Sequence, residues 1–251
     1  MNTTPLLQAQ GLTRRFGGLT AVDAVSLDLH RGQVHAVIGT NGAGKSTLIN
    51  LLSGEIAPSS GRVQLAGRDI TTLPQPARAR SGIGRSYQRT TIFPTLSVLE
   101  NCRLAAQATR QRPWSVWQAA ARCEASIEAA RAALDAAGLS DALDLTAGSM
   151  SHGKKRQLEI AMCLATAPQV LLLDEPLAGM GAEESERMLS MLERLRAEHA
   201  ILLVEHDMDA VFRVADRITV MVNGAVIASD TPQAVRACPE VQRAYLGEAH
   251  A

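Results

Sequence analysis

The 251-residue sequence contains few cysteines, and their spacing argues against cross-linking. The four cysteines lie far apart and form no CxxC pair, at Cys102, Cys123, Cys163 and Cys238. So few thiols in a chain of this length argue against a disulfide framework and against a zinc site. They fit buried or incidental thiols in the cytoplasm.

The sequence also lacks an excess of charge and a long apolar run. With 25 basic and 25 acidic residues, it has no formal net charge, which argues against an overall basic nucleic-acid binder. No apolar run approaches the length of about 20 residues that a membrane-spanning helix needs. Residues 1–11 lack the pattern of a signal peptide. We therefore expect a cytoplasmic chain without a nucleic-acid partner, and we expect any membrane-spanning helices to belong to another chain.

Lysine is scarce, because Lys45, Lys154 and Lys155 are the only lysines among the 25 basic residues. Lysine is a compact charge on a flexible stem, and arginine does not replace it in a narrow phosphate pocket. The chain therefore keeps lysine in just two places, and both lie in motifs discussed below.

The residues that are present predict a folded α/β protein. Apolar residues make up 46% and charged residues 20%, which supports a buried core. At about 100–200 residues per domain, the length fits one large domain or a core with a subdomain. Residues 5–70 are rich in strand patterns, and we expect strands over 6–12, 24–30 and 61–70.

Two further regions follow this β-rich region. Residues 89–165 contain a long alanine-rich stretch and form the best candidate for a helical subdomain. Beyond it, short apolar runs alternate with helical patterns, which predicts a mostly parallel sheet with helices on both faces. The expected strands are 34–38, 169–173 and 201–204, the expected helices 45–53, 182–197 and 208–215, and the expected hairpin 218–229 with Asn223-Gly224 at its turn.

The segment GTNGAGKST, residues 39–47, follows the predicted strand 34–38 and opens a helix, which is the context of a phosphate-binding P-loop. The order of strand, loop and helix argues against a chance glycine-rich turn. Lys45 is expected to reach the outer phosphates, and Ser46 is expected to hold Mg²⁺. The candidate nucleotide-binding residues are Gly39, Asn41, Gly42, Ala43, Gly44, Lys45, Ser46 and Thr47.

The segment VLLLDEP, residues 170–176, supplies the second half of a nucleotide site. Asp174 ends a buried strand, where an unpaired carboxylate is costly and a Mg²⁺ ion would compensate it. Glu175 follows directly and is a candidate general base for an attacking water. The alternative is that Asp174 caps the next helix.

A third motif narrows the class of NTPase. The chain has no guanine-reading NKxD, and MSHGKKRQLEIAMCLA lies at 150–165, shortly before the second phosphate motif. With these motifs the chain resembles the ATP-binding-cassette (ABC) ATPases, whose LSGGQ signature faces the γ-phosphate bound by a partner subunit. Ser151 and Gly153 match that signature, while His152 replaces a glycine and Lys154 a glutamine. Lys154 either approaches a γ-phosphate or lies on a solvated helix turn.

The resemblance implies roles for other residues. Phe16 matches the aromatic residue that stacks on adenine, and the alternative is an ordinary buried phenylalanine. Gln88 matches the glutamine that contacts Mg²⁺ and water and senses the membrane partner. His206 matches the histidine that holds the γ-phosphate and orients the water. Residues 177–181 match a loop that crosses between subunits, with Gly181 where many members have aspartate.

The resemblance covers nearly the whole chain and implies one ABC ATPase domain over residues 1–251. Its P-loop NTPase core would comprise 1–88 and 166–251, with an N-terminal antiparallel β region, and the inserted helical subdomain would span about 89–165. RFGGLTAV, DEPLAGM, VEHDMD and AYLGE are similar to the ATPase subunits of branched-chain amino-acid importers, with cousins that serve urea and amide-like solutes.

The resemblance also implies a mechanism and its partners. Two ATPase subunits, identical or related, would close around two ATP molecules with Mg²⁺, and hydrolysis would reopen them. Closure would drive integral-membrane permeases at the cytoplasmic face of the bacterial inner membrane, and a periplasmic solute-binding protein would deliver the substrate. One alternative is the ATPase of a lipid or lipopolysaccharide export system. A soluble, non-transport ABC ATPase is disfavoured, because the chain has one cassette and no heptad run.

Trp114 and Trp117 stand three residues apart, which would place them on one face of a helix. They either pack within the helical subdomain or contact the permease or the membrane interface.

Overall fold

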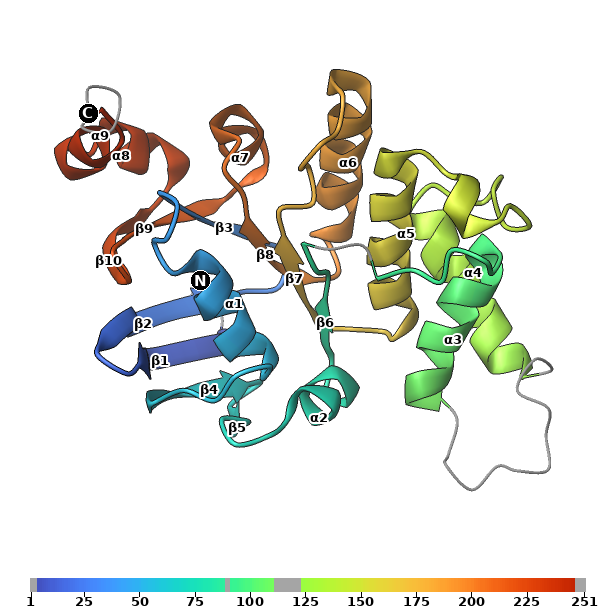
Figure 1. The fold of residues 1–251 in the computed structure, drawn as a ribbon, viewed down its shortest axis with the longest axis horizontal. Coiled ribbons are helices and arrows are strands. Elements are labelled where there is room, and N and C mark those ends of the chain that lie inside the picture. Colours follow the sequence, from blue (N-terminus) through green and yellow to red (C-terminus); the bar gives the residue numbers. More distant parts are fainter. Residues whose placement is uncertain (1–3, 89–90, 111–122, 247–251) are drawn as a thin grey trace.

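The computed structural model describes residues 4–88, 91–110 and 123–246 (Figure 1). Its N-terminal part forms a four-stranded antiparallel sheet in the order β2-β1-β4-β5. The strands are β1 (Leu7–Phe16), β2 (Leu19–Leu29), β4 (Ser60–Leu65) and β5 (Arg68–Asp69). Strands β1 and β2 are longer than the apolar pattern predicts, because a tight turn at Gly17 and Gly18 lets them pair up to that turn.

A second sheet has six strands in the order β10-β9-β3-β8-β7-β6. Its strands are β3 (Val34–Gly39), β6 (Ile83–Arg85), β7 (Val170–Asp174), β8 (Ala200–Val204), β9 (Arg217–Val222) and β10 (Ala225–Asp230). All neighbours pair in parallel except β9 and β10, which form the predicted hairpin. At its turn, Asn223 and Gly224 have φ values of 48° and 83°, as a two-residue hairpin turn requires.

Side chains of the parallel strands alternate between two apolar cores. Leu171 and Leu173 of β7 belong to the core on the side of α5 and α6, whereas Val170 and Leu172 belong to the core with α1 and the antiparallel sheet. Helices α7, α8 and α9 pack with β3 and β9 around a third cluster of buried apolar residues. These helices are α1 (Lys45–Ser53), α5 (His152–Ala165), α6 (Ala182–Leu195), α7 (Met208–Val214), α8 (Pro232–Ala237) and α9 (Pro239–Leu246).

A group of helices lies beside the β6 end of the parallel sheet (Figure 1). It contains α3 (Val98–Arg110), α4 (Glu124–Ala136) and α5, which share one apolar core, and the short 3₁₀ helix η2 (Ala147–Ser149). The predicted α/β fold, with an antiparallel N-terminal region and an inserted helical region, is therefore confirmed. Trp114 and Trp117 lie outside the described residues.

A short helix and the edge strand that follows it were not predicted from the sequence. Helix α2 (Gln75–Arg80) has six residues and β6 has three, which is too short for a periodic apolar pattern. Strand β6 becomes part of the sheet only by pairing with β7, with Ile83 opposite Val170. Among the residues described, no helix has both the length and the apolar character to cross a membrane.

Candidate nucleotide site at the carboxyl ends of the parallel strands

The P-loop joins β3 to α1, as expected. Gly44 precedes α1 with a φ of 98°, and a Cβ atom there would lie 2.3 Å from the Ala21 carbonyl oxygen, so only glycine fits. Gly42 has a φ of 78°, and a Cβ atom there would meet no protein atom within 4 Å. The loop therefore packs tightly at Gly44 and borders open space at Gly42, which leaves room for a phosphate beside the helix N-terminus.

Lys45 starts helix α1 and is 8% exposed. Its Nζ donates hydrogen bonds to the carbonyl oxygens of Gly39 at 2.6 Å and Thr40 at 3.0 Å, so the ammonium group lies within the loop. Burial lowers the pKa of this ammonium, and the nearby Glu175 and Asp174 carboxylates oppose that effect. The lysine thus faces both acidic groups of the second motif.

Asp174 ends β7 and is 5% exposed. Burial raises the pKa of its carboxyl group, and Arg85, whose Nη2 lies 4.0 Å from Asp174 Oδ2, opposes the rise. The next helix, α6, has Gly181 at its N-cap, so the alternative that Asp174 caps this helix is wrong. The buried carboxylate instead lies close enough to the P-loop lysine for the two charges to interact.

Glu175 has a φ of 49°, a left-handed conformation that is unfavourable for a residue other than glycine. Its carboxylate is the meeting point of two expected site residues. Gln88 Nε2 donates to Glu175 Oε2 at 3.1 Å, and His206 Nδ1 lies 3.9 Å from Glu175 Oε1. Gln88 comes from the segment after β6 and His206 from the segment after β8, so the sheet brings together residues that are far apart in the sequence.

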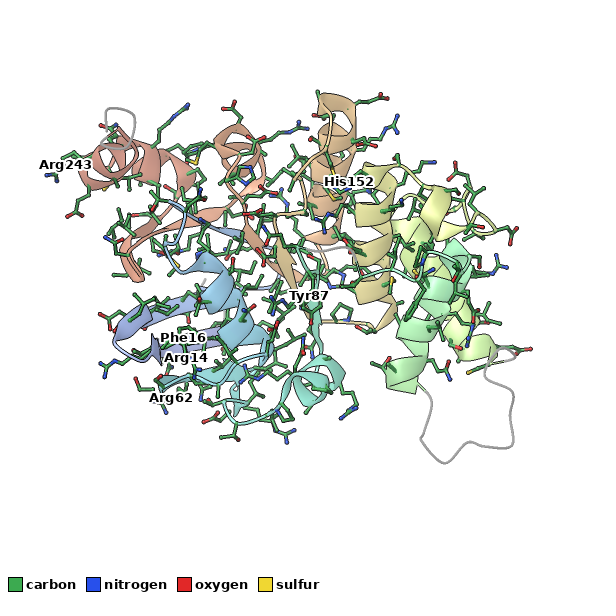
Figure 2. The ribbon with its side chains drawn as sticks, in the orientation of Figure 1. Arg14, Phe16, Arg62, Tyr87, His152 and Arg243 are labelled. Atoms are coloured by element: carbon green, nitrogen blue, oxygen red, sulfur yellow. The ribbon has the colours of Figure 1, made fainter. Side chains whose placement is uncertain are left out.

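A cleft of about 710 Å³ joins the P-loop to Gln88 and Glu175, whereas Gly39, Asp174 and His206 are not among the residues that line it. Its lining consists of Phe16, Leu19, Thr20, Ala21, residues 41–47, Gln88, Glu175, Asn223 and Gly224. Phe16 is 46% exposed, and the Arg14 guanidinium lies 4.6 Å from the centroid of its ring (Figure 2). The alternative of a buried phenylalanine is therefore wrong, and the ring is exposed at the edge of the cleft while Arg14 lies over it.

The signature segment lies at the N-terminus of α5, away from the residues that line this cleft (Figure 2). Ser151 is the N-cap, and its Oγ accepts a hydrogen bond from the Lys154 amide at 3.3 Å and donates one to Glu184 Oε1 at 2.9 Å. His152 Nε2 lies 3.0 Å from the Ala178 carbonyl oxygen. Ser151 and His152 are exposed and accessible to a second subunit, whereas Gly153 is buried against Glu184 of α6.

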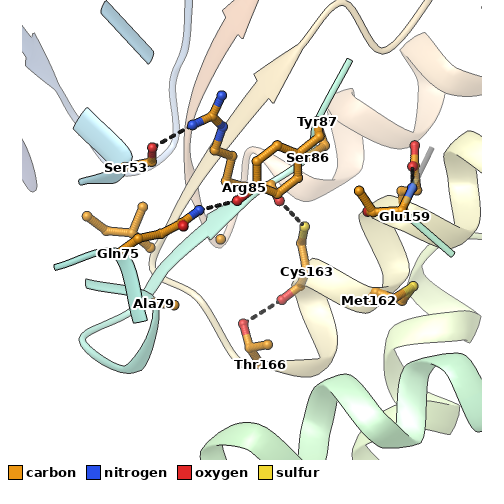
Figure 3. Close-up of a pocket in the computed structure, with 13 residues that line it drawn as sticks. Ser53, Gln75, Ala79, Arg85, Ser86, Tyr87, Glu159, Met162, Cys163 and Thr166 are labelled. Atoms are coloured by element: carbon orange, nitrogen blue, oxygen red, sulfur yellow. Dashed lines mark hydrogen bonds between the residues drawn. The ribbon is translucent and has the colours of Figure 1, made fainter. Parts of the chain in front are cut away.

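A second cavity, of about 210 Å³, lies between α2, β6 and α5 (Figure 3). Arg85, Tyr87 and Glu159 are among its lining residues, and Cys163 Sγ donates to the Arg85 carbonyl oxygen at 3.0 Å. All four cysteines are free thiols, and burial raises the pKa of Cys163 to about 12, which disfavours the thiolate form.

Two family comparisons decide what kind of nucleotide site this is. The family described as ABC transporter matches residues 22–178, and the family described as branched-chain amino acid ATP-binding cassette transporter matches residues 225–251. The chain belongs to the ABC transporter family. The expected ABC transporter ATPase is thus confirmed, and the nucleotide that this family binds is ATP.

Individual relatives are similar over almost their whole length. BraF of Pseudomonas aeruginosa, a high-affinity branched-chain amino acid transport ATP-binding protein, is 38% identical, with 98% of this chain and 99% of BraF covered. LivG of Salmonella typhimurium, which carries the same description, is 39% identical, with the same coverage. A nucleotide-free ATP-binding cassette from an ABC transporter has a TM-score of 0.86 at 30% identity and covers 96% of this chain and 99% of that chain.

Part of this site was not predicted from the sequence. Leu19, Thr20 and Ala21 reach the cleft from the start of β2, and Asn223 and Gly224 reach it from the β9–β10 turn. The NG dipeptide indicated the turn, but its position beside the P-loop depends on sheet pairing. Arg85, beside Asp174, carried no motif that could have identified it.

Proposed function

We propose that this chain is the ATP-binding and ATP-hydrolysing subunit of an importer for branched-chain amino acids or related amide- and urea-like solutes. The convergence of Gln88 and His206 on Glu175, beside the P-loop cleft, supports hydrolysis. Full-length similarity to BraF and LivG, together with the family match over residues 225–251, supports the transported solute class.

The proposed roles follow from position and chemistry. The P-loop amides and Lys45 bind the phosphates, and exposed Phe16 stacks on the adenine. Glu175 accepts a proton from the attacking water, and Gln88 and His206 hold that water and the γ-phosphate in line with it. The hydrogen bond from Gln88 helps to orient the Glu175 carboxylate, and the His206 imidazole lies 3.9 Å from the other oxygen of that carboxylate.

A magnesium ion fits the oxygen donors near the P-loop. Ser46, Gln88 and Asp174 would hold it through hydroxyl, amide and carboxylate oxygens, the donors that Mg²⁺ prefers. The burial of Asp174 is consistent with this, because a carboxylate in a dry site is stabilised by a cation. When bound, magnesium offsets the negative charge of the phosphates.

The exposed signature cannot cap the nucleotide of its own subunit, because it lies outside the P-loop cleft. We therefore propose that Ser151, His152, Gly153 and Lys154 cap ATP held by a second ABC ATPase subunit, identical or related. The domain would be divided as expected, with a core of 1–88 and 166–251 and a helical subdomain of about 89–165. The pair would associate peripherally with permeases at the cytoplasmic face of the bacterial inner membrane, with substrate supplied by a periplasmic solute-binding protein.

Co-purification tests this proposal. The tagged chain would be recovered from gently solubilised membranes of its host, and its partners would be identified. We expect two permeases, a second ATPase and a solute-binding protein. A lipid-export assembly would instead support the export alternative, and ribosomes without permeases would contradict any role in transport.

A further inference from the structure

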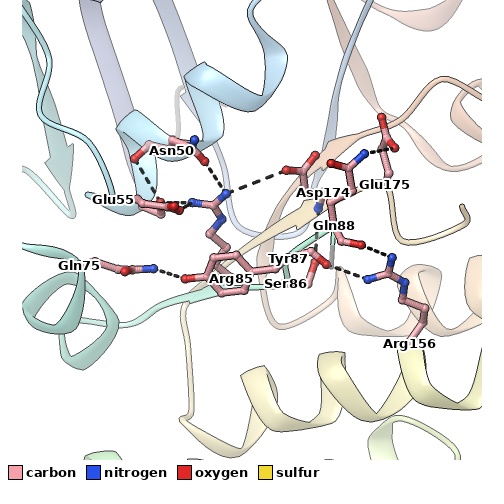
Figure 4. A network of polar contacts seen from close by, with 11 residues as sticks. Asn50, Glu55, Gln75, Arg85, Ser86, Tyr87, Gln88, Arg156, Asp174 and Glu175 are labelled. Atoms are coloured by element: carbon pink, nitrogen blue, oxygen red, sulfur yellow. Dashed lines mark hydrogen bonds and ion pairs between the residues drawn. The ribbon is translucent and has the colours of Figure 1, made fainter. Parts of the chain in front are cut away.

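Two buried arginines hold the segment that carries Gln88 (Figure 4). Arg85 lies on the core side, where its guanidinium hydrogen-bonds Asn50 and Glu55 at the end of α1. Arg156 lies on α5, in the helical region. Its Nη1 donates to the Tyr87 carbonyl oxygen at 2.7 Å, and its Nη2 donates to the Gln88 carbonyl oxygen.

Glu159 completes the contact of α5 with this segment. Its Oε2 accepts a hydrogen bond from Arg156 Nη1 at 2.9 Å, and its Oε1 accepts one from the Thr91 amide at 2.7 Å. The side chains of Arg156 and Glu159 are 7% and 3% exposed. The pair therefore hydrogen-bonds the backbone at residues 87, 88 and 91 from one turn of one helix.

These hydrogen bonds depend on the planar guanidinium group of arginine. A guanidinium presents several N–H groups in one rigid plane, so Arg156 serves two carbonyl oxygens and a carboxylate together. A lysine ammonium keeps the charge but cannot reproduce that fixed arrangement of donors. Burying an ion pair has a desolvation cost that offsets the attraction between the charges. We therefore expect the Arg156–Glu159 pair to fix the geometry of this segment more than to stabilise the fold.

The contacts of Arg156 with this segment lie next to the proposed site of hydrolysis. Arg156 holds the backbone of Gln88, and the Gln88 side chain donates to Glu175. Arg156 is also on the same helix as Ser151, which begins the signature helix. We propose that Arg156, supported by Glu159, is a positioning residue that fixes the Gln88 amide against Glu175 and joins the signature helix mechanically to this site.

This inference rests on the proposed function, because it takes Gln88 and Glu175 as residues of the ATPase site. A double-mutant cycle on the full-length chain tests it, with Arg156→Lys, Gln88→Ala and both together. If Arg156 acts through Gln88, the lysine variant loses roughly tenfold in kcat with KM for ATP nearly unchanged, and adding it to Gln88→Ala costs almost nothing more. Additive losses in kcat would overturn the inference.

Arg103→Lys is the matched control. Arg103 is a second buried arginine of the helical region, 6% exposed, and it pairs with Glu100 three residues away at 2.5 Å on α3. Its replacement is expected to leave kcat near that of the parent and to combine additively with Gln88→Ala. Equal coupling of Arg103 and Arg156 to Gln88 would indicate general loosening of the helical region and would contradict a positioning role.

A replacement variant and the activity of Gln88→Ala alone distinguish failure of this inference from failure of the proposed function. If Arg156→Lys does not fold by circular dichroism, Glu159→Gln replaces it in the cycle, since it weakens the ion pair while leaving Arg156 in place. Non-additivity is again expected, and additivity again overturns the inference. If Gln88→Ala hydrolyses ATP like the parent, the assignment of Gln88 under the proposed function fails. If Gln88→Ala is slow but the cycle is additive, only the role of Arg156 fails.

Discussion

At the scale of single residues, the sequence motifs identify charged side chains, and the fold shows which groups surround them. Lys45 is such a case, since its ammonium lies within the P-loop and faces Asp174 and Glu175. The lysines of α5 lie outside the cleft. This difference in position is what makes Lys45 the lysine expected to bind ATP.

Lys45→Ala is expected to weaken ATP binding by about 2 kcal/mol or more, roughly 30-fold in Kd. The variant removes the main positive side-chain charge beside the outer phosphates. Isothermal titration with ATP measures the change, and Lys155→Ala serves as the control that leaves binding to the isolated chain unchanged. Equal ATP affinity in Lys45→Ala and the parent would contradict the assignment.

His35 makes a residue-scale prediction about stability, because it is buried at 2% exposure with both ring nitrogens in contact with oxygen atoms. Burial lowers the pKa of its imidazole from 6.5 to about 4 in the folded protein. The unfolded chain therefore binds this proton at a higher pH. The stabilisation is complete above about pH 6.5 and is lost as the pH falls towards about 4.

The expected loss over this interval is about 3 kcal/mol in the free energy of unfolding, by the rule of 1.36 kcal/mol per pKa unit. Urea unfolding at pH 7.5 and pH 4.5 measures it. In His35→Gln, which has no titratable ring, the difference between the two pH values should be smaller by this contribution. The same difference in the variant and the parent would show that His35 does not cause it.

At the scale of elements, the contact between α5 and α6 places a carboxylate beside the signature. Ser151 Oγ donates a hydrogen bond to Glu184 of α6, and the Glu184 carboxylate lies against Gly153, where a Cβ atom would be 2.5 Å from Glu184 Cδ. A negative group therefore lies at the helix N-terminus that is proposed to meet a phosphate. It competes with that phosphate for the same hydroxyl and the same helix end.

Glu184→Gln is expected to tighten the ATP-dependent association of two ATPase subunits several-fold, because it removes a charge that repels phosphate. Light scattering with ATP, in a background that cannot hydrolyse it, measures the association. Glu183→Gln is the matched control, since Glu183 is a neighbouring exposed carboxylate that pairs with Arg187 on the same helix. Weaker association in Glu184→Gln would mean that Glu184 supports the signature.

Elements also differ in how well their sequence predicts them. The buried strands β7 and β8 and the helix α6 were predicted, because each has an apolar run or a helical period of sufficient length. Helix α2 and strand β6 were missed, since their residues become structured through contacts with distant parts of the chain. Strand β6 leads directly to Gln88, so the position of that site residue depends on the pairing of β6 with β7.

At the scale of the whole molecule, the separation of the signature from the P-loop cleft predicts that hydrolysis needs two subunits. Glu175→Gln is expected to bind ATP, to hydrolyse it at least about 100-fold more slowly, and to accumulate as a closed dimer with ATP. The change keeps the hydrogen bond with Gln88 possible while removing the base. Phosphate release and size-exclusion chromatography measure the two effects, and hydrolysis at the parental rate would exclude Glu175 as the base.

Short contiguous motifs with fixed backbone geometry were enough to predict the phosphate-binding loop, the acidic pair at the end of β7 and the class of ATPase. Which distant residues meet depends instead on how the strands and helices pack. Gln88 and His206 converge on Glu175 because β6, β7 and β8 lie side by side, and Arg156 reaches Gln88 because α5 packs beside β6. Such contacts join residues far apart in the chain, and no local pattern encodes them.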